Sequence, residues 1–131
     1  MNNKIILVGS GYLGNYLIDM LLRKNLSCDI VELARTKKNR SDTIESIQAD
    51  LDSDNLRLRS FNNGRIIYMA PPSIISLKDD RMGNFLKNLK RINIEQFVYM
   101  STSGVYGNCN GAIVDESCEV NPSTDRAKRR V

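Results

Sequence analysis

Apolar and polar residues follow two different periods along this chain of 131 residues. Short apolar runs bounded by turn residues are typical of buried strands. They stand at Lys4–Val8, Cys28–Leu33, Ile44–Gln48, Arg65–Met69 and Gln96–Met100. Two longer segments, Tyr12–Lys24 and Asp80–Arg91, have apolar residues at helical spacing. Strands that alternate with helices predict a parallel sheet with helices on both faces.

Each predicted helix has one apolar face, which we expect to pack against the sheet. In the first helix this face consists of Leu13, Tyr16, Leu17, Met20 and Leu21. In the second helix it consists of Met82, Phe85, Leu86, Leu89 and Ile92. Asp79 and Asp80 stand at the N-terminus of the second helix, where the helix dipole stabilises carboxylates. A shorter helix or a turn should follow Asp52, with Ser53 or Asp54 as its cap.

A glycine motif, Gly9-Ser10-Gly11-Tyr12-Leu13-Gly14, joins the first strand to the first helix. Gly9 permits the tight turn out of the strand, and Gly14 lets the helix pack closely on the sheet. Gly11 has no side chain, so a pyrophosphate can approach the backbone beside the N-terminus of the helix. The motif predicts a dinucleotide site formed by Gly9, Gly11, Tyr12, Leu13 and Gly14. The alternative is a glycine-rich turn in some other α/β protein.

The order of elements predicts a Rossmann-type doubly wound α/β fold. Five parallel strands joined by right-handed crossovers give the spatial order 3-2-1-4-5. Ligands of such sheets bind outside the carboxyl ends of the strands, at the point where the order reverses. The fifth strand would leave an edge of the sheet exposed. We expect a partner to cover that edge, for example a second copy of the chain.

Composition limits the classes of function. Apolar residues make up 41% of the chain, which is enough for one globular domain. No stretch has the length of a membrane span, and the first apolar run ends at Gly9, too early for a signal peptide. Three cysteines without a secretion signal predict reduced thiols in a cytoplasmic protein that does not bind membranes: Cys28, Cys109 and Cys118. The absence of histidine excludes His-based triads and His-ligated zinc, and we expect no metal site.

The net charge of +4 comes from one short segment. The basic residues of the last six positions account for the whole excess, and they are Arg126, Lys128, Arg129 and Arg130. Nucleic-acid binding requires basic residues that are spread over a surface, so we expect no nucleic-acid partner. The segment is either an anion site or a solvated helix face.

The end of the second strand bears on the choice of cofactor. An acidic residue there binds the ribose hydroxyls of NAD, whereas a nearby arginine suits the 2′-phosphate of NADP. The predicted register puts Ala34 at the acidic position, with Arg35 directly after it. We expect the Arg35 guanidinium to bind the 2′-phosphate, so NADP is favoured over NAD. Two alternatives stay open: residues 35–40 are a solvated basic loop, or a shifted register brings Glu32 to the ribose.

Two further loops leave the carboxyl ends of strands. After the third strand, Asp50 and Leu51 would place a carboxylate and an apolar side chain at the adenine. After the fourth strand, Ala70, Pro71 and Pro72 would form a small rigid wall beside the cofactor. Either loop is alternatively a simple turn.

Residues 97–107 read Phe-Val-Tyr-Met-Ser-Thr-Ser-Gly-Val-Tyr-Gly. This run resembles the S-[ST]-x-x-VYG stretch of the extended short-chain dehydrogenase/reductase family, which includes NAD(P)-dependent epimerases and dehydratases of nucleotide sugars. The acidic loop at residues 114–116 and Asn121-Pro122-Ser123 also resemble the family, so the resemblance extends from Gly9 to Arg130. It implies that Ser101 contacts the cofactor and that the Thr102 hydroxyl hydrogen-bonds the substrate oxygen.

The chain departs from this family at the catalytic pair. A Tyr-x-x-x-Lys pair should follow Pro122, where the tyrosine moves a proton and the lysine lowers its pKa. Arg126 and Arg130 stand at these two positions. An arginine stays protonated near neutral pH and cannot serve there as an acid or base, although it binds phosphate or carboxylate well. Members of the family also continue into further strands and a substrate-binding part, so the chain is expected to be a fragment.

We interpret residues 1–131 as the NAD(P)-binding domain of an atypical short-chain dehydrogenase/reductase. If the longer protein that contains this chain is active, the cofactor would exchange hydride with a small molecule or a nucleotide sugar. Thr102 would orient the substrate oxygen, and Arg126 or Arg130 would bind an anionic group. The alternatives are a non-catalytic NADP-binding module, such as a redox-sensing regulator, and a degenerate fragment that binds little. We expect no oxidoreductase or epimerase activity from this chain alone.

Overall fold

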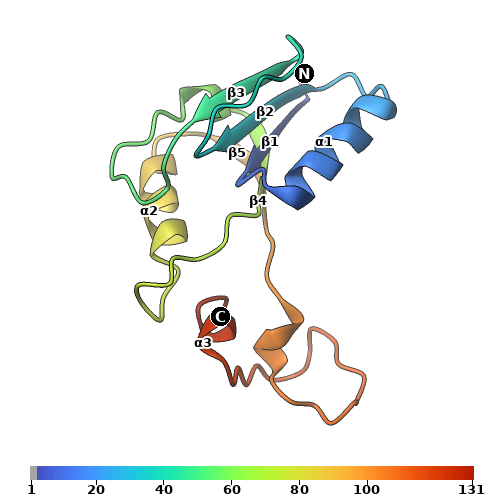
Figure 1. The fold of residues 1–131 in the computed structure, drawn as a ribbon, viewed down its shortest axis with the longest axis vertical. Coiled ribbons are helices and arrows are strands. Elements are labelled where there is room, and N and C mark those ends of the chain that lie inside the picture. Colours follow the sequence, from blue (N-terminus) through green and yellow to red (C-terminus); the bar gives the residue numbers. More distant parts are fainter. Residues whose placement is uncertain (1–2) are drawn as a thin grey trace. The chain divides into compact units, whose positions relative to one another are not determined.

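The computed structural model describes residues 3–131, which form two compact units (Figure 1). The first unit holds the chain up to Pro71 together with Asn84–Met100. The second unit holds Pro72–Gly83 and Ser101–Val131. Among the described residues, no helix is both long enough and apolar enough to cross a membrane.

A five-stranded parallel sheet forms the centre of the first unit (Figure 1). Its strands are β1 (Lys4–Val8), β2 (Asp29–Ala34), β3 (Ile44–Gln48), β4 (Gly64–Tyr68) and β5 (Ile94–Tyr99). They lie in the order β3-β2-β1-β4-β5, which confirms the predicted Rossmann-type α/β fold. Each predicted strand end lies within two residues of the observed one. Within the described sheet β5 is hydrogen-bonded to β4 alone, and the association of two copies at this edge stays a prediction.

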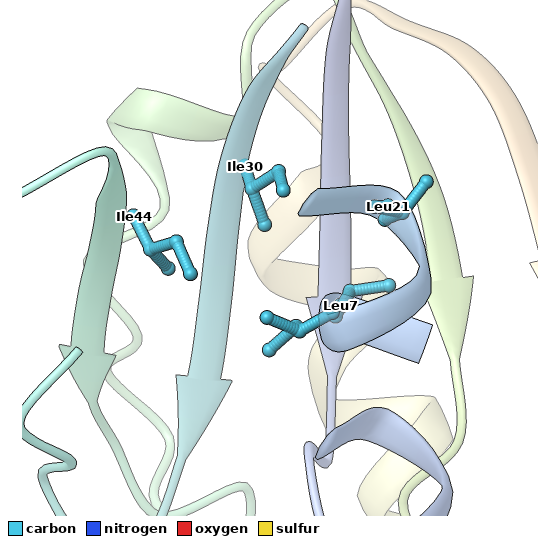
Figure 2. Close-up of a cluster of buried hydrophobic side chains, with 5 residues drawn as sticks. Leu7, Leu21, Ile30 and Ile44 are labelled. Atoms are coloured by element: carbon cyan, nitrogen blue, oxygen red, sulfur yellow. The ribbon is translucent and has the colours of Figure 1, made fainter. Parts of the chain in front are cut away.

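Helices cover both faces of the sheet, with α1 (Tyr12–Arg23) and α2 (Asp80–Leu89) on opposite sides (Figure 1). Figure 2 shows the core at α1, where Leu21 of the helix, Leu7 of β1 and Ile30 of β2 belong to one cluster of buried side chains. The α2 face holds an aromatic cluster around the buried Tyr68 of β4. Its ring centroid lies 5.3 Å from that of Phe85 and 5.9 Å from that of Tyr99. These two cores fix the sheet that carries the candidate site, because apolar burial is the main stabilising term in folding.

The predicted apolar face of α1 is wrong at three of its residues. Leu13, Tyr16 and Met20 are exposed, and the helix instead packs through Gly14, Ile18 and Leu21. A Cβ atom at Gly14 would lie 2.9 Å from the Cβ of Ser10 in the preceding loop and 3.4 Å from the Cε of Met69, so this position has no room for a larger residue. The prediction placed the largest apolar side chains at the centre of the buried face. In the structure the buried face of α1 instead includes its smallest residue, Gly14.

Two smaller predictions are confirmed only in part. On α2, Phe85 and Leu89 are buried as expected, but Leu86 is exposed. The segment after Asp52 is a turn, one of the two predicted alternatives, and its side-chain hydrogen bond comes from Asp50 in place of Ser53 or Asp54. The Asp50 carboxylate accepts a hydrogen bond from the Asp52 backbone N–H at 3.0 Å. The next helical segment is the short 3₁₀-helix η1 (Arg59–Phe61).

The second unit is built around one tight turn and one short helix. The 3₁₀-helix η2 (Ser103–Tyr106) ends at Gly107, which has a φ of +72° and lies against the backbone oxygen of Asn121. The Asn121 N–H donates to the oxygen of Val105 at 2.9 Å. The helix α3 (Asp125–Lys128) begins after Thr124, whose hydroxyl accepts from the Ala127 N–H at 3.2 Å. Within the residues that resemble the VYG turn, Gly107 is therefore needed for the fold of this unit.

Candidate functional site

The glycine loop, residues 9–14, leaves β1 at the carboxyl end of the sheet. Gly9 has a φ of +81°, a conformation that favours glycine. A Cβ atom at this position would lie 2.5 Å from the Cα of Ala70, so there is no space for a side chain. The Gly9 N–H donates to the oxygen of Leu33 at 2.9 Å, which ties the loop to the end of β2.

The space beside Gly11 is open. Apart from Gly11 and its two chain neighbours, no residue has an atom within 4 Å of the position that a Cβ would take there. Gly11 is also the N-cap of α1, where no side chain caps the helix and the first turn has no acidic residue. The free N–H groups and the positive end of the helix dipole are therefore available to an anion. Tyr12 and Leu13 are exposed beside this opening.

A buried carboxylate lies next to the glycine loop. Glu32 of β2 is 0% exposed and pairs with Leu7 and Ser46 on the neighbouring strands. Its carboxylate accepts hydrogen bonds from the Ser10 hydroxyl at 2.7 Å and from the Ser46 hydroxyl at 3.1 Å. Arg40 donates from Nε at 2.8 Å and from Nη2 at 3.1 Å. Burial raises the pKa of Glu32, but these hydrogen bonds and the charge of Arg40 outweigh it and hold the pKa below its ordinary value.

The basic loop, residues 35–43, contacts the first turn of α1. The Lys38 ammonium donates to the backbone oxygen of Ser10 and, at 2.9 Å, to the side-chain oxygen of Asn15. Arg40 donates to the same Asn15 oxygen. Arg40 has a carboxylate partner in Glu32, whereas Lys38 forms no ion pair with any residue between 3 and 131. The ammonium of Lys38 therefore adds a positive charge at the glycine loop.

The end of β2 lies one residue beyond the predicted end of this strand. Ala34 is the last residue of the strand, and its oxygen accepts from the Ala49 N–H at 3.0 Å. Glu32 lies inside the strand, two residues before Ala34, and which of the two positions faces a ribose stays a prediction. Arg35 follows Ala34 and is exposed. Its backbone oxygen accepts from the Gln48 amide at 3.1 Å, which fixes the start of the basic loop.

The other residues predicted near the cofactor differ in exposure. Asp50 and Pro71 are exposed, and Pro72 is half-buried. The Leu51 side chain is buried in the core, and its backbone oxygen accepts from Asn84 at 2.9 Å. Ala70 is also buried, because Gly9 lies against it. Contact of these residues with a cofactor stays a prediction.

The predicted catalytic residues lie in the second unit. The Thr102 hydroxyl accepts from the Gly104 N–H at 3.3 Å, which leaves its proton free to donate. The Ser101 hydroxyl donates to the backbone oxygen of Arg130 at 3.5 Å. Arg126 is exposed on α3, and Arg130 follows the helix. Their roles toward a substrate or cofactor stay predictions.

Sequence reasoning missed two contacts. One is the Glu32–Arg40 pair, whose signal was a charged residue inside an otherwise apolar strand. The other is Arg129, whose Nε donates to the oxygen of Ser76 at 2.5 Å. Residues 76 and 129 are far apart in the sequence, and no local pattern joins them. Between residues 3 and 131, no group of three acidic, histidine or cysteine side chains is placed to hold a metal ion, and the three cysteines are free thiols.

Several solved structures share this fold. The UDP-Glc/GlcNAc 4-epimerase of Campylobacter jejuni superposes with a TM-score of 0.78 at 16% identity, over 98% of this chain and 46% of its own. A Methylobacillus flagellatus protein assigned as an NAD-dependent epimerase/dehydratase has a TM-score of 0.78 at 21% identity, over 99% and 48%. The UDP-glucuronic acid 4-epimerase of Bacillus cereus, solved in complex with NAD, has a TM-score of 0.72 at 19% identity, over 97% and 48%.

These comparisons define the fold class. The chain spans less than half the length of each of these three proteins. No protein-family model matches the sequence, and no curated protein matches it. At this level of identity the likeness shows the Rossmann-type fold, which agrees with the observed strand order.

Proposed function

We propose that this chain binds a nicotinamide dinucleotide at its glycine loop, as the nucleotide-binding domain of a protein of the short-chain dehydrogenase/reductase type. The observation that carries the proposal is the open space at Gly11 beside an uncapped helix N-terminus. Gly9 and Gly14 are closed by neighbouring atoms, so the loop is rigid where it is packed and open where a pyrophosphate would lie. The UDP-glucuronic acid 4-epimerase of Bacillus cereus, which shares this fold, was solved with NAD, and this supports the choice of ligand.

We further propose that NADP binds more tightly than NAD. Neighbouring structures that were solved with a dinucleotide hold NAD, so this preference rests on the chain's own residues. Ala34 ends β2, where the ribose of the dinucleotide would lie under this proposal, and the nearby carboxylate of Glu32 is buried against Arg40. No acidic side chain is then free at the ribose from within β2, whereas Arg35 is exposed directly after it.

The test is a valine at Gly11. Because a Cβ there meets no atom within 4 Å, Gly11→Val should leave the fold intact while it fills the space of the pyrophosphate. Calorimetry should show loss of NAD and NADP binding in this variant. Gly83→Val is the matched control, because Gly83 also has open space, in α2. Unchanged affinity in Gly11→Val, or no binding by the wild type, would overturn the proposal.

A second candidate is a module that binds the dinucleotide without chemistry. The observation that favours it is the pair of arginines, Arg126 and Arg130, at the positions where the resembling family has its proton relay. A redox-sensing regulator requires affinity that depends on the oxidation state of the cofactor. Calorimetry that compares the affinities for NADP⁺ and NADPH separates this regulator from the nucleotide-binding domain of a longer enzyme that acts on a nucleotide sugar.

A further inference from the structure

Two cations reach the glycine loop, but only one of them is neutralised. Arg40 forms a two-point ion pair with the buried carboxylate of Glu32. Lys38 donates only to neutral oxygens, on Ser10 and Asn15, so its full charge stays beside the loop. The side-chain oxygen of Asn15 accepts from both cations, which holds the two side chains next to each other.

We infer that Lys38 is a phosphate-binding residue of the dinucleotide site and that Glu32, acting through Arg40 and Asn15, positions it. This inference rests on the proposed function and names a residue that sequence reasoning left in a solvated loop. An ammonium beside the open N-terminus of α1 adds a charge-assisted donor to the backbone N–H groups that would face the same anion. A phosphate oxygen would give Lys38 the anionic partner that it lacks among residues 3–131.

The positioning role follows from the burial of Glu32. Its carboxylate is bound by the Ser10 hydroxyl, in the glycine loop, and by Arg40, in the basic loop. One side chain therefore connects the two loops that Lys38 also spans. Loss of the Glu32 charge would free Arg40 and loosen the loop that carries Lys38. A long lysine side chain loses rotamer entropy when a ligand orders it, so a loop that holds it in advance favours binding.

The phosphate has two sources, the pyrophosphate and the 2′-phosphate of NADP. Calorimetry of the 131-residue chain with NADP, NAD and inorganic pyrophosphate separates them. Lys38→Met should weaken binding by roughly tenfold or more, and Lys38→Arg should retain most of the affinity. Lys37→Met is the matched control, because Lys37 is exposed in the same loop and loses the same charge. Screening by salt should keep its effect within about threefold.

Each pattern of results decides the inference. Equal losses with all three ligands assign Lys38 to the pyrophosphate, and a loss confined to NADP assigns it to the 2′-phosphate. If Lys38→Met behaves as Lys37→Met with every ligand, the inference is overturned. Pyrophosphate binding that depends on Lys38, without dinucleotide binding, would overturn the proposed function and the assignment of Lys38 to a dinucleotide site, and would leave Lys38 as a residue of a simple anion site. Binding of none of the three by the wild type overturns both.

Glu32 requires a separate readout. Glu32→Gln should weaken binding in the wild-type background and have no effect in the Lys38→Met background, because Glu32 acts through Lys38. A purely structural role would weaken both backgrounds equally and would overturn the positioning claim. Circular dichroism of each variant shows that the compared chains are folded.

Discussion

The guanidinium of Arg40 covers the carboxylate of Glu32, with its Nε 2.8 Å from Oε1 and its Nη2 3.1 Å from Oε2. The carboxylate is fully buried, whereas the arginine side chain keeps 19% of its surface exposed. The two residues therefore differ in their access to water once the ion pair is broken. A buried carboxylate without its cation has no access to water, but the arginine can turn outward.

This asymmetry predicts unequal costs of substitution. Arg40→Met should lower the free energy of unfolding by about 3–5 kcal/mol, because it leaves an uncompensated charge in the sheet. Glu32→Gln should cost less, since the amide keeps contacts with the two serines and Arg40 can reach solvent. The double variant should recover part of the loss of Arg40→Met. Urea unfolding of the three variants measures these values, and a larger cost for Glu32→Gln would contradict the prediction.

The same pair predicts a dependence of stability on pH. The folded protein holds the pKa of Glu32 below its ordinary value of 4.5. A carboxyl group with a lowered pKa contributes stability above its unfolded pKa, and this contribution is lost as the pH falls through the folded pKa. The difference in unfolding free energy between wild type and Glu32→Gln should be constant from pH 7 to about 5 and shrink at lower pH. A difference that grows on acidification would refute the assignment.

Gly9 and Gly11 should respond differently to alanine. Gly9→Ala combines a left-handed backbone with a Cβ only 2.5 Å from the Cα of Ala70, so it should cost more than about 2 kcal/mol. Gly11→Ala places its Cβ in open space and should be nearly neutral. Chemical denaturation distinguishes the two, and similar stabilities would show that the turn is more adaptable than its geometry indicates.

In the second unit, Gly107→Ala should break the turn that follows η2. Its Cβ would overlap the backbone oxygen of Asn121. Gly111 is the matched control, since it has a φ of +78° but no neighbour within 4 Å. Both variants carry the backbone strain of about 1–2 kcal/mol, and only Gly107→Ala adds the overlap. Amide exchange at Asn121, whose N–H is bonded to Val105, should accelerate in Gly107→Ala alone.

Arg35 should control the choice between the two cofactors. A charge-assisted contact with the 2′-phosphate is worth roughly 1.5–3 kcal/mol, or about one to two decades of affinity. Arg35→Ala should therefore bring NADP binding down to the level of NAD. Equal affinities of the wild type for NADP and NAD would count against a 2′-phosphate contact at Arg35. If Arg35→Ala still prefers NADP, another residue makes that contact.

The chain should have no dehydrogenase or epimerase activity of its own. An arginine at position 126 cannot relay a proton near neutral pH, and loss of general acid–base help typically lowers rates by about 10²–10⁴. Oxidation of NADPH with carbonyl compounds and nucleotide sugars should stay at background. Turnover that disappears in Thr102→Ala would reveal a proton relay that the present assignment lacks.

The sheet could be predicted from the sequence because each strand is a short apolar run between clear turn residues. The buried face of α1 could not be predicted from hydrophobicity alone, but the spacing of three residues and the glycine motif did indicate it. Gly14, Ile18 and Leu21 have spacings of four and three residues, and the third glycine of the motif must face the sheet. By contrast, the partners of Glu32 come from three separate segments, at Ser10, Arg40 and Ser46. Hydrogen-bond partners that come from separate segments can be identified only when the pairing of the strands is known.

The open space at Gly11 also affects how this protein can change in evolution. Substitutions at Gly9 or Gly14 are opposed by the fold itself, because neighbouring atoms leave no room. A substitution at Gly11 meets no such opposition, so a single codon change there could remove the proposed dinucleotide site while the sheet stays intact. If the proposed function holds, ligand binding is therefore more easily lost by mutation than the fold. Descendants of this chain that lost the site would keep the same fold, and their structures alone would not distinguish them from proteins that bind the dinucleotide.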